Sequence, residues 1–320
     1  RPNSDVLRPF RNGSDLVQDD SNRWIVDFGV GTKMEEAALY AAPFKHVVDH
    51  VKPGRVKNND KWRRNHWWLL GRTLPDFRNA TENLPRYLGT ARVAKHRLFV
   101  WQDSPVLPDS KVIAIAFADD YRFGVLQSKA HEVWTNATQA LHGGERPTYN
   151  PTECFETFAF PQATPKQEAA IVGAAKELND LRERWLNPPE WTKTVTLEFP
   201  GSIGGPWARF IDAKTVNAKT GVGTVRYPRL EALDAKSVAE LKKRTLTALY
   251  NERPAWLDLA HKKLDAAVAA AYGWPADLPD EQILGKLLAL NMERAAAEAK
   301  TAAAPKQVKP QRAKHPDELI

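Results

Sequence analysis

The chain has 320 residues, of which 42% are hydrophobic and 27% charged, and its single cysteine excludes an intramolecular disulfide and a cysteine-built zinc site. Its formal net charge at pH 7 is +7, and no apolar run approaches the roughly 20 residues that a membrane-spanning helix requires. These values predict a cytoplasmic protein, long enough for two domains and without a membrane segment.

The first half of the chain is rich in strand-like runs. Runs of β-branched and aromatic residues bounded by Gly, Pro or Asp predict strands at 5–10, 23–29, 97–101, 111–118, 121–127 and 154–160. The run at 111–118 is apolar almost throughout, so we expect a central strand covered on both faces. Thr32 and Glu35 have the spacing of a capping box and predict a helix with a kink at Pro43. A second helix is expected after Ser128.

The excess of positive over negative charge is concentrated between Lys52 and Arg97. This segment holds twelve Lys and Arg against three acids, a local charge of +9, so the rest of the chain sums to −2. Three of the eleven tryptophans lie among these cations, a combination typical of surfaces that bind nucleic acid. The alternative is a solvated surface with Trp67 and Trp68 in the core. The cations that we expect to contact the DNA backbone are Lys57, Lys61, Arg63, Arg64, Arg72, Arg92 and Lys95.

The pattern becomes helical from Thr164 onward. Thr164, Pro165 and Gln167 predict the capped start of a helix of about 20 residues that ends at Trp185. A loop and short-strand insert is expected at 187–233. Helical spacing of apolar residues predicts three further helical stretches, at 236–251, 254–271 and 280–303.

These elements predict an α+β fold, in which a mixed-sheet module precedes a mainly helical module. The polar, Pro-containing C-terminus predicts a flexible tail. The expected division is an α+β domain at 1–163, a mainly helical domain with its insert at 164–303, and the tail at 304–320.

Two motifs could indicate an enzyme. VDFGVGT at 26–32 stands between a predicted strand and helix, but it lacks the third glycine of the dinucleotide fingerprint and the Lys-Ser/Thr of a P-loop. Asn187-Pro188-Pro189-Glu190 resembles the tetrad of amino-methylating DNA methyltransferases, but Glu190 replaces the aromatic residue that stacks on the flipped adenine. A tight turn explains the glycines of the first motif equally well, and an ordinary Pro-Pro linker is the better interpretation of the second.

The remaining polar residues predict no metal or catalytic site. His46 and His50 are four residues apart on a predicted helix, but the sequence suggests no third ligand. Cys154 lies in an apolar run, where a buried thiol is the default.

Five motifs occur in an order that resembles the target-recognition region of MmeI-type DNA methyltransferases, which are single-chain restriction–modification and phage-defence enzymes. They are LRPFRNGSDL (7–16), WIVDFG (24–29), LPRYLGTARVAKHRLFVW (84–101), VLPDSKVIAIAFADDYRFGVLQSKAHEVW (106–134) and YNPTECFETFAFP (149–161). The later segments RYPRLEALD, LKKRTLTALYNERPAWLDLAH and DAAVAAAYGWPADL resemble the helical C-terminal part of these proteins. The resemblance extends from about residue 5 to residue 300.

The resemblance implies a role in recognition of double-stranded DNA. In that family the catalytic domain precedes this region and transfers a methyl group from S-adenosylmethionine to the amine of an adenine. The chain lacks these catalytic motifs and starts without Met, so we expect part of a longer protein, with no cofactor in this part and the methyltransferase domain upstream. One alternative is a self-contained methyltransferase that uses 26–32 for S-adenosylmethionine and 187–190 for the base. Another is an RNA-binding or scaffold protein.

The resemblance also implies that bases are read by variable polar positions between the constant motifs. Lys111 or Arg146 would donate to a guanine edge, and Glu145 would accept from the amine of cytosine. Simple loop solvation is the alternative for Lys111 and Arg146. The candidate base-reading residues are Thr90, Ser110, Lys111, Glu145 and Arg146.

Overall fold

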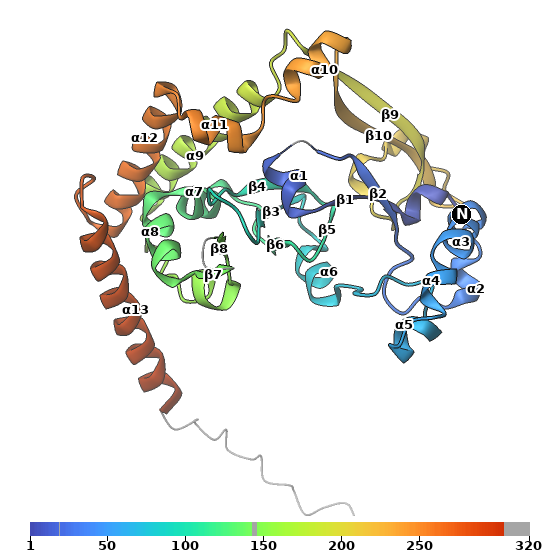
Figure 1. Ribbon diagram of the computed structural model, residues 1–320, viewed down its shortest axis with the longest axis horizontal. Helices are drawn as coiled ribbons and strands as arrows, with labels where there is room; N and C mark the ends of the chain where they lie inside the picture. The colour runs from blue at the N-terminus through green and yellow to red at the C-terminus, as the bar shows by residue number, and fades with distance from the viewer. Residues whose placement is uncertain (19, 143–145, 304–320) are drawn as a thin grey trace, which may run out of the picture.

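The structure is a computed structural model that describes residues 1–18, 20–142 and 146–303, with only the backbone described for His142, Arg146 and residues 299–303. Small sheets lie at the centre of the molecule, between short N-terminal helices on one side and longer C-terminal helices on the other (Figure 1). Helices account for 48% of the residues and strands for 18%, which confirms the predicted α+β class and its mainly helical C-terminal part.

The first sheet is formed by the N-terminal segment. After a 3₁₀ turn, η1 (Asn3–Val6), strand β1 (Leu7–Arg11) pairs antiparallel with β2 (Arg23–Val26), and the short helix α1 (Gly13–Val17) lies between them in sequence. On its other edge, β1 pairs in parallel with β5 (Leu107–Pro108). The prediction of strands near 5–10 and 23–29 is therefore confirmed.

The second sheet has the order β4-β3-β6 and is antiparallel throughout. Its central strand is β3 (Arg86–Ala91), flanked by β4 (Val100–Asp103) and β6 (Val112–Ile115). The prediction of a central strand at 111–118 is wrong, because β6 is an edge strand with half-buried residues in its middle. The central position belongs to β3, in which five of six residues are buried.

The run at 121–127, predicted as a strand, is the helix α7 (Asp120–Gln127). The side chain of Asp119 accepts a hydrogen bond from the backbone N–H of Arg122 at 2.8 Å and caps this helix. A Cβ at Gly124 would lie 2.9 Å from side-chain atoms of Ala175 and Ile171, so the glycine permits close contact with the next long helix. Burial on several sides removed the helical periodicity from the sequence.

The predicted strand at 154–160 is also absent. A π-helical turn covers Pro151–Phe155, and the side chain of Asn150 accepts a hydrogen bond from the backbone N–H of Thr152 at its start. The aromatic residues of this run serve the core rather than a sheet, and Cys154 is fully buried there as expected.

The N-terminal helices differ from the prediction in their capping. The hydroxyl of Thr32 donates to the carbonyl of Phe28 instead of forming a capping box with Glu35. Pro43 lies in the first turn of a new helix instead of kinking a continuous one. The helices of this region are α2 (Met34–Ala37), α3 (Ala41–His50), α4 (Lys52–Arg55), α5 (Lys61–Asn65) and α6 (Pro75–Thr81).

The long helices of the second half follow the prediction more closely. Thr164 and Gln167 form the predicted capping box of α9 (Pro165–Leu186), and α8 (Lys129–Thr138) follows Ser128. The predicted helix at 236–251 is two helices, because one ends at Leu241 and the next begins at Leu246. The later helices are α10 (Ala235–Leu241), α11 (Leu246–Glu252), α12 (Ala255–Tyr272) and α13 (Asp280–Ala303).

The insert at 187–233 is a long β-hairpin rather than a loop with short strands. Its strands β9 (Thr192–Ser202) and β10 (Val222–Ala232) pair antiparallel along their full length. The hairpin contacts the N-terminal segment: Asp5 accepts from the backbone N–H and the hydroxyl of Ser202, and Trp207 Nε1 donates to the carbonyl of Ser4 at 3.0 Å. The short 3₁₀ turns η3 (Ala208–Phe210) and η4 (Ala213–Thr215) lie between its strands.

A single cluster of buried apolar side chains joins the two halves of the chain. It contains Leu88 and Phe123 from the first half, together with Ile171, Leu264 and Leu287 from the second. A smaller cluster around Phe28 and Trp67 holds the N-terminal helices together. The domain boundary at 163 stays a prediction, and the main core extends across it.

Asp265 of α12 is a carboxylate whose pKa is raised to about 6, mainly by burial, and it accepts a hydrogen bond from the backbone N–H of Lys129 at 2.7 Å. The native state therefore binds more protons than the unfolded chain between pH 3.8 and about 6, so the stability contributed at this site falls as pH rises through that window. We expect Asp265→Asn to raise the free energy of unfolding by about 3 kcal/mol above this window and to leave it unchanged at its lower end. Urea unfolding at both pH values measures the difference, and an equal gain at both would contradict the titration.

Candidate nucleic-acid interface

The cations of α4, α5 and the adjoining loops are mostly exposed, and we call this segment the basic lobe (residues 52–72). Lys57, Lys61 and Arg72 are exposed and make no ion pair among the described residues. Their charges are therefore free to meet phosphates. The lobe lies at the lower right of Figure 1.

Arg63 and Arg64 are partly engaged within the basic lobe. Arg63 Nε lies 3.5 Å from a carboxylate oxygen of Asp60, and Arg64 Nη1 donates to the backbone carbonyl of Asn58 at 2.8 Å. The exposed ion pair adds little stability. These two arginines order the lobe and keep part of their charge toward solvent.

A second group of candidate residues meets at the end of the second sheet. The backbone N–H of Arg92 donates to the carbonyl of Lys111, and the N–H of Tyr149 donates to the carbonyl of Arg92, both at 2.8 Å. Val93 also forms a β-bridge with Thr148. Three segments that the sequence separates are thus adjacent. Arg92, Ser110 and Lys111 are exposed. We call these three residues, together with the neighbouring strand β8 (Arg146–Thr148), the sheet end.

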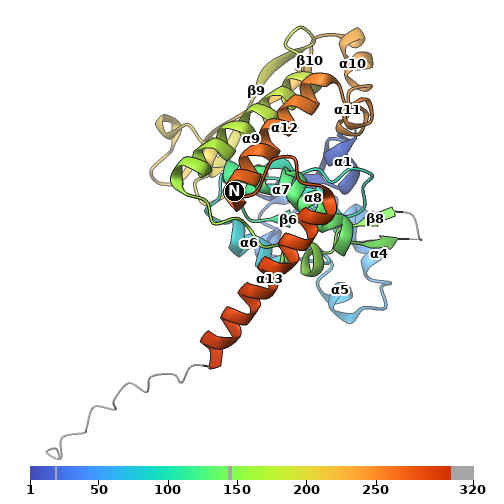
Figure 2. The same ribbon diagram turned by 90° about the vertical axis from the view of Figure 1, so that its left-hand side faces the viewer.

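The short hairpin β7–β8 was predicted only as a loop. Its strands β7 (Ala140–His142) and β8 (Arg146–Thr148) pair antiparallel, with Arg146 opposite His142. Glu145 lies outside the described residues, and only the backbone of Arg146 is described. The hairpin and α4–α5 project toward the same side in Figure 2, and Figure 1 places α6 between them.

The structure removes one base-reading candidate. Thr90 is fully buried in β3, with 0% of its surface exposed, and its hydroxyl accepts a hydrogen bond from Arg97 Nη1 at 3.0 Å. A side chain in this position cannot meet a base edge. The position in the strand explains the difference, because β3 is the central strand of its sheet and is buried on both faces, whereas the exposed Arg92 lies just beyond its end.

Lys95 is exposed, but it is connected to the helical half of the chain. Its Nζ donates to Asn251 Oδ1 at 2.6 Å, and His96 Nε2 lies 2.9 Å from the same oxygen. No acid is paired with Lys95 among the described residues. Its charge remains available, although its position is fixed by the end of α11.

Arg97 is a half-buried residue that packs beneath the sheet end and bonds to the end of β3. The sequence does not indicate this role, because Arg97 lies within a predicted strand. Its guanidinium also donates to the carbonyl of Ala91 and lies 4.8 Å above the ring of Tyr149. Burial lowers the pKa of Arg97 to about 10. The Tyr149 hydroxyl donates to Nε2 of the buried His131 at 3.2 Å, and burial lowers the pKa of this histidine to about 3. The network joins β3 to the segment that follows β8.

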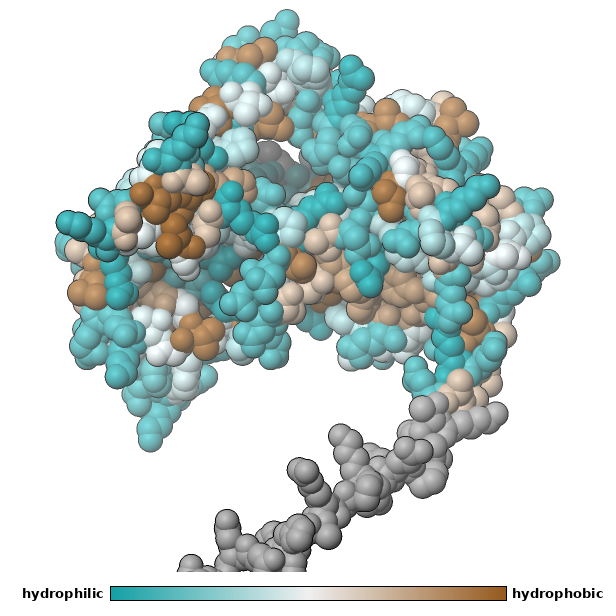
Figure 3. All heavy atoms as spheres, turned by 180° about the vertical axis from the view of Figure 1, so that it is seen from behind, coloured by the Kyte–Doolittle hydropathy of each residue, from teal (hydrophilic) through white to brown (hydrophobic). Residues whose placement is uncertain are grey.

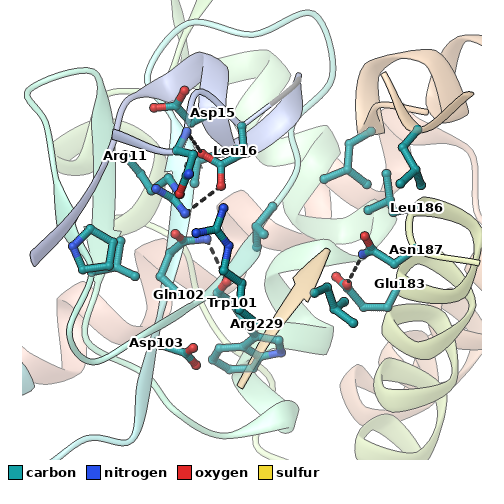
Figure 4. A pocket seen from close by; sticks show the side chains of 18 of the residues that line it. Arg11, Asp15, Leu16, Trp101, Gln102, Asp103, Glu183, Leu186, Asn187 and Arg229 are labelled. Carbon is teal, nitrogen blue, oxygen red and sulfur yellow. Dashed lines mark hydrogen bonds and ion pairs between the residues drawn. The ribbon is translucent and has the colours of Figure 1, made fainter. Parts of the chain in front are cut away.

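The two motifs that could indicate an enzyme do not meet. The largest cavity that Asn187 lines, of about 650 Å³, lies between β10, α1 and β4, and no residue of 26–32 lines it (Figure 4). Asn187 Nδ2 donates to a carboxylate oxygen of Glu183 at 3.3 Å. The turn at 26–32 instead packs on the basic lobe, where Trp68 Nε1 donates to the carbonyl of Thr32 at 2.8 Å. Gly29 and Gly31 both have positive φ, as a tight turn requires.

Carboxylates near these motifs already have partners. Asp27 is 5% exposed, and both of its oxygens accept from Arg78 Nη2 at 2.9 Å. In the cavity of Figure 4, Asp103 accepts from the hydroxyl of Tyr227 at 3.1 Å. No group of three or more potential metal ligands occurs among the described residues. Within the same residues, no helix is long and apolar enough to cross a membrane.

The comparisons with known proteins give a structural likeness. No protein family and no curated protein matches the chain. One solved structure, the type IIL restriction–modification enzyme MmeI in complex with DNA, is similar with a TM-score of 0.60 and 17% sequence identity. The match covers 91% of this chain and 31% of the MmeI chain. The chain therefore shares its fold with part of a restriction–modification enzyme that was solved on DNA.

Proposed function

We propose that the chain is the sequence-specific recognition module for double-stranded DNA of an adenine-specific methyltransferase that uses S-adenosylmethionine. In this proposal the catalytic domain lies upstream in the same polypeptide and belongs to restriction–modification or phage defence. The observation that carries the proposal is the sheet end, where Arg92, Lys111 and strand β8 are brought together although they are far apart in sequence. The fold shared with part of MmeI supports it.

The two exposed groups suggest two tasks. The basic lobe would hold phosphates, which gives affinity and salt dependence without sequence preference. The sheet end would present polar side chains to base edges in the major groove. Seen from behind, the surface is hollowed along its lower edge between the N-terminal helices and the C-terminal helices (Figure 3). Hydrophilic side chains lie along this hollow, together with several apolar ones (Figure 3).

Selection from a random pool of duplexes tests the proposal. We expect the chain to enrich one short motif, and Lys111→Gln to change the preferred base at one position of that motif, at a cost of about 1–3 kcal/mol for the original base. The carbonyl of Lys111 holds Arg92 through the backbone, so this substitution changes the side chain without removing that contact.

Lys236→Gln is the matched control for this experiment. Lys236 is also exposed but belongs to α10, which Figure 1 places at the top of the molecule, away from the sheet end. Enrichment of the same motif by wild type and Lys111→Gln would exclude Lys111 as a reader. Enrichment of no motif by the wild-type chain would reject sequence-specific recognition.

Binding of S-adenosylmethionine separates this proposal from a self-contained methyltransferase. No residue of the turn at 26–32 lines the cavity that Asn187 lines, which disfavours a shared site. Isothermal titration with S-adenosylmethionine should show no binding in the micromolar range. Micromolar affinity for the isolated chain would favour the alternative enzyme.

A further inference from the structure

A column of aromatic rings extends from the core of the basic lobe to its surface. Phe44 contacts Trp67 with ring centroids 5.6 Å apart, and Trp67 contacts Trp68 at 5.7 Å. Trp68 contacts His66 at 5.6 Å, and His66 stacks on Trp62 at 4.9 Å with an angle of 22° between the planes. The inner rings are buried or half-buried, so the column has a fixed base.

Trp62 is the exposed end of this column. One face of its indole lies against His66, and 42% of the residue is open to solvent. A hydrogen bond of 3.0 Å between His66 Nδ1 and the carbonyl of Trp62 holds the two residues together. The remaining face is therefore presented in a fixed orientation, which reduces the entropy lost when a planar ligand stacks on it.

The charges around Trp62 indicate the kind of ligand. Lys61, Arg63 and Arg64 belong to the same short helix α5, and Asp60 at its start is the single acid between Lys52 and Arg72. A planar ring among cations matches a nucleotide, in which a flat base is attached to a phosphate.

Trp24 is as exposed as Trp62 but lies in different surroundings. It is 43% exposed and also stacks on a single ring, that of Trp207, at 5.8 Å. Trp24 lies on β2, outside the basic lobe, beside the cavity below the long hairpin. The two tryptophans thus differ in their charged surroundings rather than in exposure.

We infer that Trp62 is a stacking platform for an unpaired nucleobase, held beside the phosphates that the basic lobe contacts. The inference rests on the proposed DNA-binding function and adds a second mode of contact to it. A base displaced from the helix would lie on the free face of Trp62 while Lys61 and its neighbours contact the flanking phosphates. Every base has a π face, so this contact would not depend on sequence.

Binding of the chain to two duplexes tests the inference. One duplex is fully paired, and the other carries a single unpaired 2-aminopurine, whose fluorescence falls when it stacks on an aromatic ring. We expect the wild-type chain to quench this fluorescence and to bind the duplex with the unpaired base on the order of tenfold more tightly. Trp62→Ala should abolish both effects, and Trp62→Phe should retain most of them.

The outcomes separate this inference from the proposed function. Trp24→Ala is the control, and it should keep both the quenching and the preference of the wild type. If Trp62→Ala binds both duplexes as the wild type does, or if the wild type shows no preference for the unpaired base, the stacking platform is wrong while DNA binding stands. If the wild type binds neither duplex, the proposed function fails as well.

Discussion

Asp27→Asn should lower the free energy of unfolding by about 3–5 kcal/mol, the cost of breaking a buried ion pair from one side. Both oxygens of Asp27 accept from Arg78, and Arg8 Nη1 lies 3.6 Å from one of them. Burial already lowers the pKa of Arg8, and the nearby carboxylate opposes that shift. Without the negative charge, two largely buried guanidinium groups would face each other unpaired. Urea unfolding followed by circular dichroism measures the loss.

The matched control is Asp49→Asn, which also removes an aspartate paired with a cation. Asp49 accepts from Lys45 within the exposed face of α3, so this change should have no measurable effect on unfolding. Equal effects of the two substitutions would show that burial of the pair is unimportant. Asp27 joins β1 to α6, so we also expect its loss to loosen the entry to the basic lobe.

Reversing Lys57 and Lys61 together to Glu should weaken binding to every duplex by a similar factor. Each phosphate contact contributes about −0.9 to the slope of log affinity against log salt concentration, so the magnitude of the slope should fall by about 2. At moderate salt we expect a loss of affinity on the order of 100-fold. These two lysines are better targets than Arg63 and Arg64, which also contact Asp60 and Asn58. Fluorescence anisotropy at several salt concentrations measures both quantities.

Lys236→Glu with Lys242→Glu is the control for this change, because both lysines are exposed and the net charge changes equally. They lie at α10, outside the basic lobe. An equal loss of affinity in the control would show that total charge, rather than the position of the lobe, determines binding. An unchanged salt slope in the Lys57 and Lys61 variant would show that the lobe does not contact phosphates.

Local signals predicted some elements well. The helix α9 follows from Thr164, Pro165 and Gln167, which satisfy its first backbone donors without help from the rest of the fold. The apolar runs at 121–127 and 154–160 carry no such signal of their own. Their residues contact several neighbouring elements, so neither a period of two nor one of 3.6 is visible, and the tertiary environment determines their structure.

For the candidate interface, the sequence indicates the segments that take part better than it indicates the individual residues. The resemblance to a family predicts base-reading residues in the segments around Arg92, Lys111 and β8. Hydrogen bonds between their backbones show that these segments are adjacent. Thr90 was misassigned because its strand faces the core at that position. Arg97 was missed because its role depends on Tyr149, 52 residues further along the chain, and no spacing in the sequence reveals that contact.

The contacts between the long hairpin and the N-terminal segment have a consequence for how the chain acquires its structure during synthesis. Ser4 and Asp5 contact Trp207 and Ser202, which are about 200 residues further along the chain. At a translation rate of roughly 5–20 residues per second, these partners follow the N-terminal segment by about 10–40 s. Ser4 and Asp5 are therefore made long before they gain these native contacts.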